Sequence, residues 1–299
     1  MAKVFGPAIN IDGAVNYEVF QTEEQLTQQM KILRDAGFTY VDISYEGLVY
    51  QYSKEWEENF LRALDNTGLI PYQSHALFLN AIVREGDHLR MNLSPEQKTA
   101  LERMFQVAGR RGTKLMIFHP QFLYPDLWGD EWLAEHLRVN VEFFEWMGRL
   151  AKPHGIRIAV ETMANLGLYR HYCTRIEELE ELVDTLREKD PEVFGICVDT
   201  GHLHFAGYAP HEVVRRFGKK IIAFHIQDNN TCTDQHNLPP FGTIDWNAFI
   251  DAVREVGFEG PLTFECQGGH LRKQPPEWKL PYFTYAKSIG DVFVQKINA

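Results

Sequence analysis

The sequence has few cysteines, no long apolar run and no excess of basic residues. The four cysteines are never spaced as C-x-x-C: Cys173, Cys197, Cys232 and Cys266. Scattered cysteines argue against a disulfide framework and favour a reduced, cytoplasmic protein. No run of about 18 apolar residues occurs, so no transmembrane helix is predicted. The first residues also lack the apolar centre of a secretion signal.

The charge balance is acidic. The chain has 30 Lys and Arg against 41 Asp and Glu, a formal net charge of −11. Proteins that bind nucleic acid usually present a basic surface, so we expect neither a nucleic-acid nor a membrane partner. The 299 residues are 44% hydrophobic and 24% charged, as in globular proteins. Because no break in composition divides the chain, we expect a single domain over residues 1–299.

Short apolar runs alternate with segments of helical periodicity. The runs predict strands at residues 3–11, 40–46, 69–77, 114–120, 156–163, 194–202, 221–228 and 261–267. Eight such strands, each followed by a crossover, predict a parallel sheet closed into a (β/α)8 TIM barrel, an α/β fold. An open doubly wound sheet is the structural alternative, but its glycine-rich phosphate-binding fingerprint is absent.

Several of the intervening segments carry signals for the start of a helix. Thr22 and Gln25 have capping-box spacing at the start of residues 22–37, as do Ser94 and Gln97 at the start of residues 94–109. Thr174 is the expected cap of a helix over residues 174–188, and a further helix is predicted over 245–257. Residues 207–218 are long enough only for a modest helix.

Polar residues stand at or just after the ends of the predicted strands. They are His75, His119, Glu161, Asp199, His202, His225, Asp228 and Glu265. In a TIM barrel these side chains meet at one rim, where catalytic residues lie. Each alone could be a buried polar residue or a helix cap, and Asp199 is a good candidate for a cap. Together, however, converging carboxylates repel one another unless a cation joins them. Carboxylates and histidines are ligands for divalent metals, so the pattern predicts a metal site.

Five motifs carry a family resemblance: "AVETMAN", "CVDTGHLHFAG", "AFHIQD", "GTIDW" and "LTFECQ". They resemble the xylose-isomerase-like TIM-barrel superfamily, which contains sugar isomerases, sugar epimerases and endonuclease IV. The likeness to its ketose 3-epimerase and hydroxypyruvate-isomerase-like branches implies four metal ligands, Glu161, Asp199, His225 and Glu265. It also implies that His202 contacts the substrate.

That resemblance implies a metal-dependent sugar isomerase or epimerase acting on a ketose or related hydroxy-carbonyl compound. One divalent ion (Mn²⁺, Mg²⁺, Co²⁺ or Zn²⁺) would chelate adjacent carbonyl and hydroxyl oxygens and stabilise an enediolate. Glu161 and Glu265 are then the expected acid/base pair. Further expected substrate contacts are His75, His119 and His236, with Tyr45, Phe78 and Trp128 packing on the carbon face of a sugar.

Other functions remain open. Asp234 and His236 form a D-x-H pair, as in endonuclease IV, and the histidines at the strand ends could complete a three-zinc phosphodiesterase site. The acidic charge and a shorter loop before this pair favour the isomerase. A dehydratase would use the same ligands, and a binding protein without catalysis is a further alternative. Basic residues near residue 114 precede their strand, which favours an unphosphorylated sugar. The tail 282–299 either completes the barrel or forms a contact in a homo-oligomer.

Overall fold

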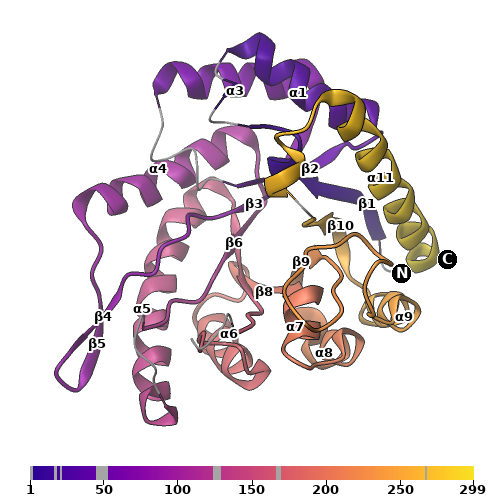
Figure 1. Cartoon of the computed structure of the whole chain (residues 1–299). Coiled ribbons are helices and arrows are strands. Elements are labelled where there is room, and N and C mark those ends of the chain that lie inside the picture. The colour runs from indigo at the N-terminus through magenta and orange to yellow at the C-terminus, as the bar shows by residue number, and fades with distance from the viewer. Residues whose placement is uncertain are drawn as a thin grey trace.

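The computed structural model describes residues 3–16, 19–20, 22–44, 53–123, 129–165, 170–266 and 268–299. Parallel strands form a closed barrel in the order β1-β10-β9-β8-β7-β6-β3-β2 (Figure 1). The strands are β1 (Lys3–Asn10), β2 (Tyr40–Ser44), β3 (Ile70–His75), β6 (Leu115–Phe118), β7 (Arg157–Glu161), β8 (Phe194–Asp199), β9 (Ile221–Ile226) and β10 (Glu259–Phe264). The predicted (β/α)8 barrel is confirmed.

Helices surround the barrel on its outer side (Figure 1). The longer ones are α1 (Glu23–Asp35), α3 (Lys54–Thr67), α4 (Pro95–Arg111), α5 (Leu133–Ala151), α6 (Ile176–Lys189), α8 (Pro210–Phe217), α9 (Trp246–Val256) and α11 (Pro276–Asn298). The shorter ones are α7 (Thr200–Phe205), α10 (Gly268–Leu271), η1 (Ile11–Gly13), η2 (Asp130–Trp132), η3 (Lys152–His154) and η4 (Gly218–Lys220). Within the described part of the chain, no helix has both the length and the apolarity that a membrane crossing requires.

The capping signals succeed at two helices and fail at a third. The side chains of Thr22 and Gln25 cap α1 reciprocally, and those of Ser94 and Gln97 do the same for α4. The predicted cap Thr174 is wrong. Its hydroxyl donates to the carbonyl oxygen of His171 at 2.7 Å, and α6 begins at Ile176 without a side-chain cap. Acidic residues in the first turn of α6 still complement the helix dipole.

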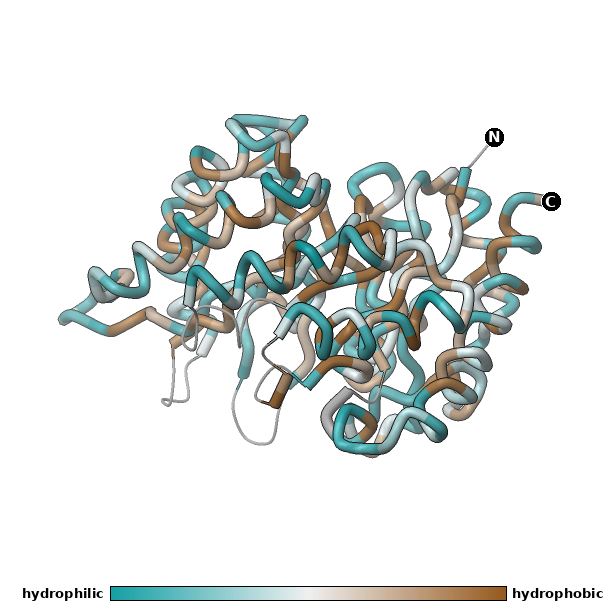
Figure 2. Tube along the Cα trace, turned by 90° about the horizontal axis from the view of Figure 1, so that it is seen from above, coloured by the Kyte–Doolittle hydropathy of each residue, from teal (hydrophilic) through white to brown (hydrophobic). Residues whose placement is uncertain are grey.

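Two layers of apolar side chains position the rim. The larger layer lies between the strands and the amphipathic helices, along which hydrophilic and hydrophobic residues alternate in Figure 2. A smaller cluster includes Ala159, Cys197 and Ala223. Each of these three stands two residues before a polar residue of the rim, so strand alternation places it on the same inward face, one layer below. The polar rim therefore rests on a packed apolar floor.

A hairpin and the C-terminal helix complete the fold. The antiparallel pair β4 (Ile82–Glu85) and β5 (His88–Met91) was not predicted, because its charged residues hide the strand pattern. The hairpin lies against α5, where the amide of Leu89 donates to Glu135 at 2.7 Å (Figure 1). The tail completes the barrel: α11 runs beside β1, and the Asn298 side chain bonds both the amide and the carbonyl of Val4.

Candidate active site

The predicted polar residues meet at the carboxyl ends of the strands. His75, Glu161 and Asp199 are the last residues of β3, β7 and β8. His119 and Glu265 follow β6 and β10 directly, while His225 lies inside β9. The parallel register of the barrel brings these residues to the same level, as the pairing of Asp199 with His225 illustrates. The rim therefore collects residues from six strands, as the strand-end pattern predicts.

The central group consists of Glu161, Asp199, His225 and Glu265. One ligand atom from each lies within 4.8 Å of the others. Nδ1 of His225 is 2.6 Å from Oε1 of Glu161 and 3.0 Å from Oε2 of Glu265. Burial raises the pKa of Asp199 to about 7; the charge of His202 opposes this shift, and the charges of Glu161 and Glu265 add to it. Converging buried carboxylates of this kind fit a divalent cation, which removes their repulsion.

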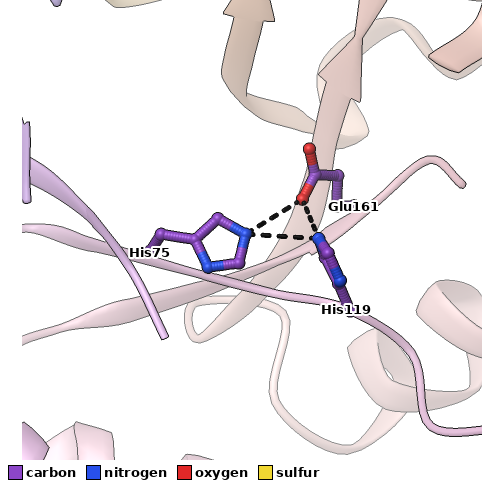
Figure 3. A group of neighbouring side chains, drawn as sticks. All are labelled: His75, His119 and Glu161. Atoms are coloured by element: carbon purple, nitrogen blue, oxygen red, sulfur yellow. Dashed lines mark hydrogen bonds and ion pairs between the residues drawn. The ribbon is translucent and has the colours of Figure 1, made fainter. Parts of the chain in front are cut away.

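A second group shares Glu161 with the first. Nε2 of His119 lies 3.0 Å and Nε2 of His75 lies 3.4 Å from Oε2 of Glu161, and the two histidine nitrogens are 3.2 Å apart (Figure 3). Nδ1 of His75 is 2.9 Å from the carbonyl oxygen of Ala76, which can only accept a hydrogen bond. The Nδ1 atom of His75 therefore carries a proton, and its Nε2 is left to face Glu161.

A third group contains the D-x-H pair. Oδ2 of Asp234 lies 3.0 Å from Nε2 of His236 and 3.4 Å from Nε2 of His202. The Nδ1 atoms of both histidines face backbone carbonyls, those of Glu265 at 3.1 Å and Thr162 at 2.9 Å. Burial opposes protonation of His236, but hydrogen bonding to Asp234 outweighs it and raises the pKa to about 9. All three groups match the chemistry of a metal ligand set.

Asp199 is both a helix cap and a member of the central group. Its Oδ1 accepts the backbone N–H of His202 at 2.6 Å, which caps the short helix α7. This cap ends the strand at Asp199, so the predicted strand over residues 194–202 is too long. The backbone N–H of Asp199 donates to Oγ1 of Thr162 at 2.9 Å, which fixes β8 against the residue after β7.

Gln227, which the sequence analysis missed, connects the central and third groups. Its Nε2 donates to Oδ1 of Asp234 at 2.9 Å and lies 3.4 Å from Oδ2 of Asp199. A Cβ atom on Gly201 would lie 2.2 Å from Cδ and Oε1 of Gln227. Gly201 does not have a positive φ. Its missing side chain therefore makes room for Gln227, and no local sequence signal specifies this contact between the two residues.

A cavity of about 400 Å³ opens over these groups. Its apolar wall includes Phe78, Phe122 and Met163, and its polar wall includes Glu161, His202 and other members of the three groups. The ring of Phe78 stacks on His75 with centroids 4.7 Å apart. Among the described lining residues none is Lys or Arg. Tyr45 and Trp128, predicted to pack on a sugar, lie outside the described residues.

Asp228 does not join these groups, contrary to the strand-end prediction. Its side chain turns away and accepts the indole N–H of Trp246 at 2.9 Å and the amide of Asn229 at 3.0 Å. The carboxylate is fully buried, and these donors satisfy it. Asp228 thus holds the loop after β9 against α9. The period-2 alternation from His225 predicts inward-facing Gln227, not Asp228.

Comparison with known proteins places the chain in a family. The family model of the xylose isomerase-like TIM barrel matches residues 30–280. An inosose isomerase of Bacillus velezensis is 23% identical over 250 residues, which cover 80% of this chain and 82% of that protein.

Two solved structures are similar in fold. A D-tagatose 3-epimerase-like protein has a TM-score of 0.73 at 20% identity, with 98% of each chain covered. The IolI protein with a bound zinc atom has a TM-score of 0.72 at 19% identity, covering 97% of this chain and 99% of that one. At these identities the structural likeness establishes the fold alone.

Proposed function

Because the chain belongs to the xylose isomerase-like TIM barrel family, we propose that it is a divalent-metal-dependent isomerase or epimerase of a sugar or related hydroxy-carbonyl compound. The observation that carries this proposal is the group of Glu161, Asp199, His225 and Glu265 below the cavity. The epimerase-like protein, the inosose isomerase and the zinc-containing protein to which the chain is similar support it.

Four residues would hold the metal: Glu161, Asp199, His225 and Glu265. A divalent ion at this position supplies Lewis acidity, which makes the C–H bond beside a substrate carbonyl easier to ionise. The residues fit such an ion, because three carboxylates and one histidine meet there with ligand atoms within 4.8 Å of one another. Manganese, magnesium, cobalt and zinc all accept this mixture of oxygen and nitrogen ligands.

Glu161 and Glu265 are the proposed acid/base pair. They stand at the ends of β7 and β10, which β8 and β9 separate in the barrel, so they approach the cavity from different directions. Burial opposes ionisation of Glu265, but the charge and hydrogen bond of His225 outweigh it and lower the pKa to about 2. Burial opposes ionisation of Glu161 as well, but the charge of His225 outweighs it and lowers the pKa, so both residues are ionised at neutral pH. One would take the proton from carbon. The other would first take up a proton from solvent and then return it to the opposite face or to the neighbouring carbon.

The histidines around the cavity are the proposed substrate contacts. His202 and His236 direct Nε2 toward Asp234, and His119 directs Nε2 toward Glu161. Each Nε2 can donate to a hydroxyl or carbonyl oxygen of a bound sugar, and His75 supports His119 from behind. The apolar wall with Phe78 offers a surface for the carbon face of the sugar.

Solvent exchange tests this function. We expect the metal-loaded protein to incorporate deuterium from D₂O into at least one member of a panel of ketoses and keto-cyclitols. The Glu265→Gln variant should lose about 100-fold or more of this rate, because it removes a general acid/base. Metal content must be measured in both proteins, since a lost ion would also stop exchange. Glu85→Gln, on the exposed hairpin, is the control. Exchange at C3 indicates epimerisation, and exchange at C1 indicates isomerisation. Near-normal exchange by metal-loaded Glu265→Gln refutes the assignment of Glu265 as a general acid/base.

A multi-metal phosphodiesterase is the second candidate, favoured by the two further groups. His75 and His119 meet the second carboxylate oxygen of Glu161, and His202 and His236 meet Asp234. Three ions would be held in this way, as the D-x-H pair suggests. The net charge of −11 and the absence of Lys and Arg from the described cavity lining count against a nucleic-acid substrate. Metal analysis separates the candidates: about one ion per chain supports the isomerase, and about three support the phosphodiesterase.

A further inference from the structure

Asp42 is a buried carboxylate with one partner. It lies in the middle of β2 between Val41 and Ile43, and its side chain is fully buried. Oδ2 of Asp42 lies 3.3 Å from Nε2 of His225. Neither oxygen of Asp42 nor Nε2 of His225 makes a hydrogen bond among the described residues, so this contact is a close approach of two buried polar groups that lack other partners. Removing a carboxylate from water is costly unless another group compensates it. The interaction with His225 is therefore the one that explains why an acid occupies this position.

The contact crosses the interior of the barrel. β2 and β9 are not neighbours, because β1 and β10 lie between them in the sheet. Asp42 thus approaches His225 from the side opposite to the central group. The other nitrogen of His225, Nδ1, faces Glu161 at 2.6 Å and Glu265 at 3.0 Å. His225 is held between a carboxylate on one side and the metal ligands on the other.

We propose that Asp42 is a positioning residue for the metal centre, which accepts the Nε2–H of His225 and so directs the Nδ1 lone pair at the bound ion. The inference rests on the metal site of the proposed function. A metal-bound histidine commonly donates its second ring N–H to a carboxylate, which fixes the tautomer and the ring orientation. Asp42 is placed for that role, because its Oδ2 lies 3.3 Å from the nitrogen that does not face the other ligands, and both atoms lack another hydrogen-bond partner among the described residues.

Asp12 provides a matched control. It is a half-buried acid whose pKa responds to Asp42: burial, followed by the charge of Asp42, raises the pKa of Asp12 to about 7. No hydrogen bond or ion pair among the described residues joins Asp12 to His225. Asp12→Asn therefore removes the same charge from the same region but leaves the contact with His225 intact. The pair of variants separates positioning from a general effect of negative charge near the ion.

The test measures the dissociation constant for Zn²⁺ by competition with a chromogenic chelator at pH 8. Wild type, Asp42→Asn and Asp12→Asn are compared. We expect Asp42→Asn to bind Zn²⁺ about 10- to 100-fold more weakly, and Asp12→Asn to stay within about threefold of wild type. The thermal midpoint of each protein is measured in EDTA. A merely structural Asp42 would lower that midpoint and leave the affinity of the folded protein unchanged.

Several results would overturn the inference. These are an affinity of Asp42→Asn within about threefold of wild type, an equal loss in Asp12→Asn, or no binding of Zn²⁺ by wild type. The result is independent of turnover. Weakened binding in Asp42→Asn alone, in a protein that exchanges no sugar proton, would uphold the role of Asp42 and refute the proposed function. If the protein exchanges a sugar proton but Asp42→Asn binds Zn²⁺ as tightly as wild type, the proposed function is upheld and the role of Asp42 is refuted.

Discussion

Replacing Gly201 by alanine should disturb the site through Gln227. The added Cβ would lie 2.2 Å from Cδ and Oε1 of Gln227 and 2.7 Å from its Cγ. Gln227 is fully buried, so its side chain cannot swing into solvent. To restore an ordinary contact it must move by about 1.3 Å, because carbon atoms pack at about 3.5 Å. Such a movement breaks the bond to Asp234 at 2.9 Å and the one accepted from the His236 amide at 3.1 Å.

The cost follows from these contacts. Overpacking contributes about 1–3 kcal/mol. A hydrogen bond to a charged group contributes about 1.5–3 kcal/mol, and a neutral one about 1 kcal/mol. We therefore expect Gly201→Ala to lose about 4 kcal/mol of unfolding free energy, or on the order of 8 °C in thermal midpoint for a chain of this size.

Urea and thermal unfolding in EDTA measure this loss of unfolding free energy. A double-mutant cycle shows how much of it arises through Gln227. In a Gln227→Ala background both the clash and the two hydrogen bonds are absent, so Gly201→Ala should cost about 4 kcal/mol less than in wild type. Gly6→Ala is the control, because its Cβ would meet Tyr40 at an ordinary 3.9 Å. An unfolding midpoint of Gly201→Ala equal to that of wild type would refute the reasoning. An unchanged cost in the Gln227→Ala background would refute the part assigned to Gln227.

Two further predictions concern pH and metal removal. Burial lowers the pKa of His136 from 6.5 to about 4, and the ring donates to the Trp132 carbonyl and accepts from the Leu123 amide. At a pH between these two pKa values, His136 is protonated in the unfolded chain but neutral in the folded chain, so the unfolding free energy falls as the pH falls. Between pH 7.5 and pH 5, wild type should lose about 2 kcal/mol more unfolding free energy than His136→Gln, as measured by urea unfolding at both pH values. Equal pH dependence of the two proteins would contradict this prediction. Removal of the ion should lower the thermal midpoint, because a ligand at about 1,000 times its Kd stabilises by about 4 kcal/mol. Added Zn²⁺ should restore the midpoint after EDTA, and a midpoint indifferent to both would count against the metal site.

The sequence was informative where the fold repeats a simple rule. Parallel strands bring their carboxyl ends to one rim, so Glu161, Asp199 and Glu265 could be placed together without coordinates. Asp42 carries the same signal as Asp199, a carboxylate within an apolar strand, but it stands in the middle of β2. Its partner lies across the barrel, and a position along the chain does not specify contacts through the lumen. Alternation from His225 predicts that Gln227 faces inward, but the space that Gly201 leaves for it depends on how α7 packs against the residue after β9, which periodicity does not encode. The β4–β5 hairpin was missed because it is short and charged.

Glu161 is where the two candidate functions diverge. Its Oε1 faces His225, and its Oε2 faces His119 and His75. With a single ion in the central group, Oε2 of Glu161 would be free of metal, and the Nε2 atom of His119 could donate a hydrogen bond to Oε2 or to a substrate, with His75 behind it. With an ion in each group, Glu161 would be a ligand shared by two groups, and the Nε2 atoms of His119 and His75 would be ligands with no proton to give. His202 and His236 face the same choice at Asp234. A histidine nitrogen cannot donate a hydrogen bond and bind a metal at once. The number of ions per chain therefore assigns the roles of these four histidines together, and with them the class of substrate that the cavity can hold.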